Sequence, residues 1–443
     1  MSDFRTIETE ASDLRKSGKF KEALAIYRPL WNERQGEFNN WATWSYAKCA
    51  QKSGELDEAE QVVRTCVEQW PDFDQGRQLL AWCHYYRHFQ NELPPNEPVS
   101  KEYWRAAEDV VALCKGDMHS QYAPAVRVIF SVVKRLEDYP STQENVRKRL
   151  DWLGHLSPNQ LSSQGSSFQD QTGKTRQVAS DQENWYSHMS KALLDGEQYE
   201  DCIALCEEAL GRVRQLHYNN DIWFGKRIAE AKGKLGRVEE AIQDHKELVL
   251  KKPEWFLFYD LACLENQLGN GDEALRYASE AALARSPLHF KSDLFLLLAV
   301  LLRNDGQEEL AKQHAQLAAS VRSEEGWAAK GSRLERFESF GVEVEGGPSA
   351  KDLARQLKKY WQEWRAEALP EHEGEIDWFN DEKGFGFIKV PGQRDSVFFH
   401  IKSFIGPEDQ IQSGARVSLL LKDSYDKKKG QMSTQAVDVK PLG

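Results

Sequence analysis

Several features are scarce or absent in this sequence. Seven cysteines in 443 residues are too few for a disulfide scaffold, so we expect a reducing, cytoplasmic setting. Lys and Arg number 58 against 70 Asp and Glu, and the formal charge of −12 excludes a uniformly basic coat for nucleic acid. No run of eighteen apolar residues occurs, which excludes a transmembrane helix, and the first twenty residues lack the apolar core of a secretory signal.

Motifs for catalysis and metal binding are also missing. The sequence has no G-x-x-x-x-G-K-[ST] phosphate loop, no C-x-x-C pair, no H-E-x-x-H and no nucleophile elbow. Cys202 and Cys206 lie four residues apart, on one face of a predicted helix. We interpret them as small side chains that pack between helices. We therefore expect a protein that is not an enzyme and that uses no cofactor, no metal and no small-molecule substrate.

The sequence does contain an internal repeat with a period of about 34 residues. In the clearest copy, residues 40–71, one helical stretch reaches Gly54 and a second one ends at Pro71. The same layout recurs three times, with the turn glycines Gly236, Gly269 and Gly306. Glycine at the turn tolerates positive φ, alanines let the two helices approach closely, and proline cannot continue a helix.

This pattern resembles the tetratricopeptide repeat family, in which each unit is a helix-turn-helix stacked on its neighbours. The resemblance covers roughly residues 4–71 and 182–325. It implies an α-solenoid with a concave groove for a protein partner, but not the lysine-and-asparagine clamp that receives acidic chaperone tails. Five aromatic residues are candidates to line the groove, with packing between repeats as the alternative: Trp41, Trp44, Trp223, Phe256 and Tyr259.

Composition suggests where the helical part is divided. Residues 157–181 are rich in Ser and Gln and nearly free of aliphatic side chains, so we predict a flexible linker. It would separate one solenoid half, residues 1–156, from a second half, residues 182–348. Within the first half, residues 72–156 read as degenerate repeats or as a separate helical insert. Residues 349–371 form an amphipathic helix that caps the solenoid or extends a basic path into the next domain.

From Gly374 onward the pattern changes to short strands and turns. The stretches W-F-N-D-E-K-G-F-G-F-I (378–388) and V-F-F-H (397–400) alternate in the manner of β-strands. Phe385 and Phe387 share one face, whereas Ile388, Val397 and Phe399 supply the opposite, inward face. Two further strands near residues 417–419 and 436–439 bring the number to five, which indicates a small barrel.

The two stretches are similar to the ribonucleoprotein-type motifs of the cold-shock domain family. The resemblance assigns residues 372–443 to an OB-fold barrel that binds single-stranded RNA or DNA. It implies base stacking or backbone contact for seven residues: Trp378, Phe379, Lys383, Phe385, Phe387, Phe398 and His400. The alternative for Phe385 and Phe387 is a place in the barrel core.

Charge in this last domain predicts modest affinity for nucleic acid. Asp377 stands where the family usually carries a lysine, and residues 370–443 hold ten Lys and Arg against twelve Asp and Glu, a net charge of −2. Few counterions would therefore be released on binding, and the salt dependence should be shallow.

Together these observations predict a mainly α protein: a tetratricopeptide-like solenoid in two halves, followed by a small all-β, five-stranded OB-fold barrel. We interpret it as a non-catalytic adaptor that holds a protein partner in the solenoid and single-stranded nucleic acid on the barrel. RNA is expected in preference to DNA, although the residues themselves do not distinguish the two. The alternatives are a protein-interaction scaffold whose barrel has lost nucleic-acid binding, and an accessory subunit of a nucleic-acid-processing complex.

Overall fold

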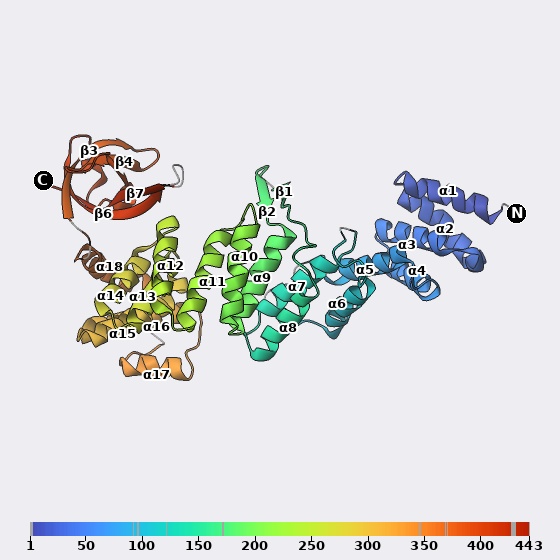
Figure 1. Cartoon of the computed structure of the whole chain (residues 1–443), viewed down its shortest axis with the longest axis horizontal. Helices are drawn as coiled ribbons and strands as arrows, with labels where there is room; N and C mark the ends of the chain where they lie inside the picture. Colours follow the sequence, from blue (N-terminus) through green and yellow to red (C-terminus); the bar gives the residue numbers. More distant parts are fainter. Residues whose placement is uncertain are drawn as a thin grey trace. The chain divides into compact units, whose positions relative to one another are not determined.

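The computed structural model of the chain describes residues 3–91, 93–94, 97–120, 122–170, 172–344, 347–367, 369, 371–426 and 431–442. The chain divides into two compact units, residues 1–220 and 221–443 (Figure 1). The first unit is built of helices and one hairpin, and the second combines helices with a β-barrel. The predicted fold class, helical repeats followed by a five-stranded barrel, is confirmed.

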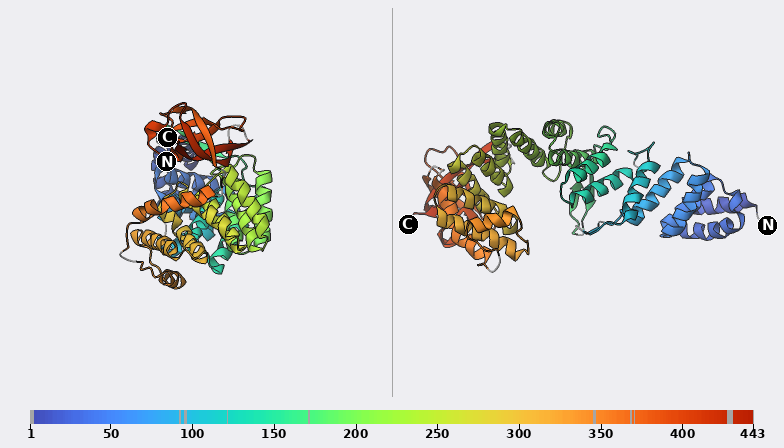
Figure 2. Two further views of the ribbon diagram at one scale, coloured as in Figure 1. Left: turned by 90° about the vertical axis from the view of Figure 1, so that its left-hand side faces the viewer. Right: turned by 90° about the horizontal axis from the view of Figure 1, so that it is seen from below.

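In the first unit, consecutive helices pack against each other in the order of the chain. The helices are α1 (Phe4–Lys16), α2 (Phe20–Arg34), α3 (Asn40–Ser53), α4 (Leu56–Gln69), α5 (Asp74–His88), α6 (Lys101–Leu113), α7 (Ala125–Glu137), α8 (Gln143–Gly154), α9 (Asp181–Asp195) and α10 (Tyr199–Arg212). The predicted helices of residues 72–156 are thus present as α5 to α8. Figure 2 gives two further views of these paired helices.

The repeat of residues 40–71 shows how the sequence makes one such pair. The side chain of Asn39 caps α3 by accepting a hydrogen bond from the backbone N–H of Ala42 at 2.9 Å. The helix ends at Gly54, which has a φ of 91°. Glycine adopts this left-handed conformation at little energetic cost because it has no Cβ. Ala47 and Ala59 are fully buried where α3 and α4 meet, because small side chains allow this close approach.

The segment 157–181 contains a hairpin, whereas its composition predicted only a flexible linker. Strands β1 (Ser166–Gln169) and β2 (Thr175–Val178) pair in antiparallel fashion and are almost wholly exposed. The helices on either side of the segment pack directly on each other. The indole N–H of Trp185 in α9 donates to the carbonyl of Leu153 in α8 at 3.1 Å, and Arg149 pairs with Asp195 at 2.8 Å.

The compact units therefore divide after residue 220, and the predicted linker lies inside the first unit. Periodicity could not reveal this, since the contacts between α8 and α9 join residues more than thirty positions apart. The domain limits and the mobility inferred for residues 157–181 stay predictions.

The helices of the second unit repeat the same pairing. They are α11 (Asn220–Lys234), α12 (Val238–Lys251), α13 (Trp255–Gln267), α14 (Gly271–Leu283), α15 (Ser292–Asn304), α16 (Glu308–Glu324), α17 (Ser332–Ser339) and α18 (Ala350–Glu367). The last of them, α18, packs on α14 and α16 through the predicted apolar face. Trp361 stacks on Phe295 with centroids 5.8 Å apart and donates its indole N–H to His314 at 2.9 Å. This contact joins α18 to α15 and α16, and the capping role of the helix stays a prediction.

The barrel of the second unit has five strands: β3 (Glu371–Asn380), β4 (Phe385–Lys389), β5 (Val397–His400), β6 (Arg416–Asp426) and β7 (Gln431–Pro441). They close in the order β3-β4-β5-β7-β6, with β5 and β7 parallel and the other pairs antiparallel. Buried residues alternate with partly exposed ones along β4 and β5, as the sequence pattern predicts. Its centre includes Ile376, Ile388, Val397 and Phe399.

Candidate nucleic-acid interface

A β-bulge at Asp377 determines which aromatic residues of β3 face outward. Ile376 opposes Ile388 and is fully buried, whereas Trp378 opposes Phe387 and is 43% exposed. In a regular strand, residues two apart share a face. The extra residue in the bulge shifts this phase by one, so the indole of Trp378 points to solvent although Ile376 points into the core.

Four rings from three neighbouring strands form a continuous outer surface, which we call the platform: Trp378, Phe385, Phe387 and Phe398. The centroid of Trp378 lies 5.6 Å from that of Phe385 and 5.8 Å from that of Phe387. Phe398 lies 5.7 and 5.8 Å from the same two rings. The three phenylalanines are only half-buried, so they do not belong to the core.

His400 extends the platform beyond Phe385, its partner across β4 and β5. The backbone N–H of Lys402 donates to Nδ1 of His400 at 3.2 Å, which directs the other ring nitrogen away from this turn. The glycine between the two phenylalanines is required by close packing. A Cβ at Gly386 would lie 2.4 Å from the carbonyl oxygen of Trp378 and 2.7 Å from the ring of Phe399.

Two of the seven predicted residues lie elsewhere. Phe379 packs against the barrel core and stacks on Phe399 at 5.7 Å, because the bulge turns it inward when it turns Trp378 outward. Lys383 is exposed in the turn between β3 and β4, beside the acidic side chains Asp381 and Glu382. The structure thus brings five of the seven together, with Lys383 on an adjoining turn.

The electrostatics of the platform edge depend on Asp377. Its carboxylate pairs with Lys389 at 2.7 Å and accepts a hydrogen bond from the hydroxyl of Ser396 at 3.2 Å. The hydrogen bond with Lys389 lowers the pKa of Asp377 and raises the pKa of Lys389. The positive charge of Lys389 is therefore partly neutralised by the residue that departs from the family pattern.

The aromatic candidates for a partner groove fall into two separate groups. In the first unit, Trp41 is 52% exposed and contacts Trp44 and Phe73 with centroids 5.8 and 4.9 Å away. In the second unit, Trp223 stacks on Phe256 at 5.0 Å with nearly parallel rings. Because the groups belong to different compact units, they are two separate candidate surfaces.

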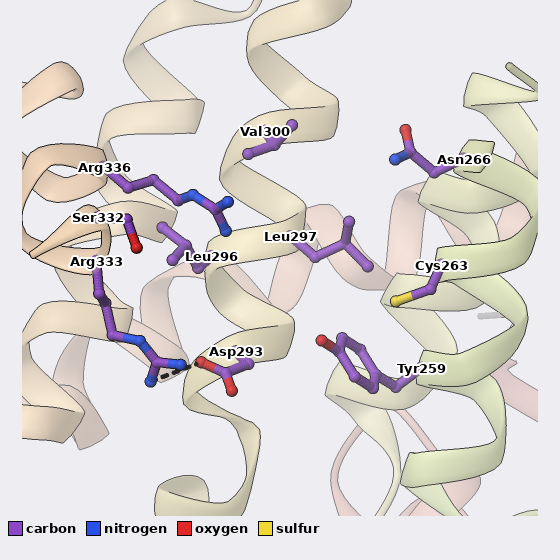
Figure 3. A pocket seen from close by; sticks show the side chains of 10 residues that line it. All are labelled: Tyr259, Cys263, Asn266, Asp293, Leu296, Leu297, Val300, Ser332, Arg333 and Arg336. Carbon is purple, nitrogen blue, oxygen red and sulfur yellow. Dashed lines mark ion pairs between the residues drawn. The ribbon is translucent and has the colours of Figure 1, made fainter. Parts of the chain in front are cut away.

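A groove of about 540 Å³ lies between α13, α15 and α17 in the second unit. Figure 3 shows its apolar floor, Leu296, Leu297 and Val300, with Tyr259 and Cys263 on the opposite wall. Arg333 and Arg336 enter from α17, and Arg333 pairs with Asp293 at 3.2 Å. Among the predicted aromatics, Tyr259 lines this groove. The two arginines were missed because α17 lies outside the repeat pattern.

Thiols and metal-type clusters offer no other site in the described part of the chain. Six of the seven cysteines are buried, and burial raises the pKa of Cys66 and of Cys263 to about 11. No three His, Cys, Asp or Glu side chains in the described ranges come together as a metal site. Among the same residues, no helix is long and apolar enough to span a bilayer.

Two family models match separate stretches of the chain. Residues 372–442 match the family described as the 'Cold-shock' DNA-binding domain, and residues 14–83 match the tetratricopeptide repeat. The first match contains every platform residue, and the second contains α2 to α4 and most of α5.

Two cold-shock proteins are similar to part of this chain. The major cold shock protein CspA of Bacillus cereus is 43% identical over 51 residues, which are 11% of this chain and 75% of that protein. The cold shock protein CapA of Pseudomonas fragi is 39% identical over 64 residues, 14% of this chain and 91% of that protein. Among solved structures, a tetratricopeptide repeat protein from Parabacteroides merdae has 12% identity and a TM-score of 0.34, covering 73% of this chain and 98% of its own.

Proposed function

The chain belongs to the cold-shock domain family through residues 372–442, and on this premise we propose that it is a non-catalytic adaptor. In this proposal the barrel binds single-stranded nucleic acid and the helical repeats hold a protein partner. The observation that carries the proposal is the exposure of the platform. Its rings lie on β3, β4 and β5, whereas β6 and β7 make contacts with the helices.

Stacking supplies the affinity in this proposal. Each base that lies on an exposed ring contributes about 1–3 kcal/mol, and every base has a face that can stack. The four rings of the platform offer a path for several successive bases with little dependence on sequence. Binding of phosphates adds less, because Lys389 is already paired with Asp377.

We propose RNA as the first ligand and DNA as the second. The platform contacts bases through ring faces, which occur equally in both strands, so the discrimination would come from groups that contact the 2′-hydroxyl. Matched RNA and DNA oligonucleotides of one sequence therefore provide the direct comparison.

For the protein partner we propose the groove between α13, α15 and α17. Its floor of leucine and valine side chains and its two arginines fit an extended segment that carries apolar residues and a carboxylate. The aromatic surface around Trp41 and Trp44 in the first unit is the second candidate. It combines exposed rings with Arg15, whose guanidinium lies 5.1 Å from the ring of Trp44.

The test of the platform is the double variant Phe385→Ala with Phe398→Ala. Losing two stacks should weaken binding of a labelled oligo-pyrimidine strand at least about 30-fold, as measured by fluorescence anisotropy. Phe290→Ala is the control, because Phe290 is a solvent-exposed phenylalanine on the helical part of the same unit, away from the platform. Far-UV circular dichroism should report an unchanged fold. A double variant with wild-type affinity would contradict the stacking assignment.

A scaffold without nucleic-acid binding remains the competing function, and the acidic flank with Asp377 favours it. The same titration separates the two, since a scaffold would show no binding to either oligonucleotide in the wild-type protein. An accessory role in a processing complex is compatible with the adaptor and would be recognised by copurification of a nucleic-acid-modifying enzyme.

A further inference from the structure

One outer face of the barrel is buried although it points away from the barrel core. Along β6, Val417, Leu419 and Leu421 belong to the core. The residues that alternate with them therefore point outward: Ser418, Leu420 and Lys422. Leu420 is nevertheless only 6% exposed, and its partner on β7, Val437, is 7% exposed. Neither belongs to the barrel core, and α12 lies against β6 (Figure 1).

Beside this apolar pair, four charged side chains meet between the barrel and the helices. Lys422 of β6 pairs with Glu280 of α14 at 2.8 Å and lies 4.6 Å above the ring of Phe258 in α13. Arg365, in the last turn of α18, binds Asp438 of β7 through both Nε, at 3.0 Å, and Nη2. It also lies 4.0 Å from Glu280. Two cations and two carboxylates thus balance in a place that solvent barely reaches.

The backbone at Asp438 supports a special role for this residue. Asp438 has a φ of 50°, which is uncommon for a residue with a side chain. It lies in a bulge of β7, where Asp438 and Val439 together oppose Leu419 between the pairs Ser418–Lys440 and Leu420–Val437. Bulges with a left-handed residue usually carry glycine there. Here an aspartate is kept, and its carboxylate reaches the helical part.

Burial makes this arrangement depend on every member. Burial lowers the pKa of Lys422, and Glu280 acts in the opposite direction. Removing one partner would leave a charge in a poorly solvated place, which is much less favourable than removing a surface ion pair.

From these observations we propose that Glu280, Arg365, Lys422 and Asp438, with the pair Leu420 and Val437, form a lock that holds the barrel on the last helices. The lock makes the barrel a fixed part of the second unit instead of a domain tethered by the residues after α18. These are positioning residues, since none of them belongs to the platform. The platform then keeps one orientation relative to the groove between α13, α15 and α17.

The test measures the distance between two spin labels in the full chain by pulsed electron paramagnetic resonance spectroscopy. One label is placed at Glu308→Cys, exposed on α16, and the other at Glu375→Cys, exposed on β3, with Cys263 replaced by serine. The locked protein should give a single narrow distance distribution. Asp438→Gly should broaden it severalfold, because glycine accepts the positive φ but removes the carboxylate.

Controls separate loss of the lock from loss of the fold. Asp438→Asn, which keeps an acceptor for Arg365, should broaden the distribution less than Asp438→Gly. Asp423→Asn, a neutralisation of an exposed residue of β6, should leave it unchanged. The thermal unfolding curve of each variant should show that the barrel still folds. A broad distribution in the unmutated background, or a narrow one in Asp438→Gly, would overturn the proposal.

Discussion

Asp377 has two opposite effects on the platform: it occupies the bulge that exposes Trp378, and its charge weakens the attraction of the platform edge for phosphate. It occupies the bulge that turns Trp378 outward, and its side chain holds Lys389 at 2.7 Å. The bulge is a backbone property that another residue can maintain, whereas the negative charge belongs to the aspartate. The two contributions can therefore be separated by a substitution that keeps the size of the side chain.

We expect Asp377→Asn to strengthen oligonucleotide binding about three- to tenfold at low salt, because it removes a carboxylate beside the platform and releases Lys389. The salt dependence should become steeper by about 0.7 in the slope of log K against log salt, the value for one additional phosphate contact with a single strand. Anisotropy titrations over a series of salt concentrations measure both. Asp272→Asn, an equal charge change on α14, should change neither.

Several contacts between helices connect the two sides of residues 157–181, where the sequence predicted a linker. Glu137 of α7 accepts hydrogen bonds from His188 at 2.9 Å and Lys191 at 2.8 Å, both on α9. Burial opposes the ionisation of Glu137, but the contacts with His188 and Lys191 outweigh it and lower the pKa to about 2. These contacts join helices on the two sides of residues 157–181, so the ionised carboxylate helps to hold the first unit together.

The pKa of Glu137 predicts a pH-dependent contribution to stability. The folded value of about 2 lies below the ordinary 4.5, so the contribution is complete above about pH 4.5 and is lost as the pH falls toward 2. A shift of this size corresponds to about 3 kcal/mol. In urea unfolding, Glu137→Gln should be less stable than wild type at pH 6, and the difference should shrink at pH 3. Glu144→Gln, at an exposed acid of α8, should show little difference at either pH.

At the scale of the whole chain, the platform, the α13–α15–α17 groove and the proposed lock all belong to residues 221–443. The first unit contributes a separate surface, the aromatic group around Trp41. The adaptor proposal therefore places nucleic acid and one candidate partner site on the same compact unit.

This division predicts that the fragment 221–443 binds an oligonucleotide with an affinity within about twofold of the full chain, because every ring of the platform and its support are retained. The fragment 1–220 should not bind measurably under the same conditions. Anisotropy titrations of both fragments, with circular dichroism to confirm helix content, provide the measurement. A tenfold weaker affinity of a folded 221–443 would mean that the first unit also contacts the strand.

Short-range patterns in the sequence were sufficient for the classes of structure and for most of the platform. Turn glycines and alanines that recur once per repeat predict the pairing of helices. The period of two residues along β4 and β5 predicts that their aromatic side chains face outward. These features depend on neighbours within a few residues, so each can be recognised from a local stretch. The confirmed barrel and repeats belong to this group.

Features that depend on distant residues were not accessible in the same way. The bulge that separates Trp378 from Phe379 is defined by pairing with β4, and the α8–α9 contacts bypass the Ser- and Gln-rich segment. Arg365 and Asp438 are 73 positions apart in the sequence. Helical and strand periodicities relate residues only a few positions apart, so they do not reveal this pair. Whether a charge is exposed or buried, and which charge it meets, depends on the packing of complete elements against each other. The order of charged residues along the sequence does not show how the elements pack.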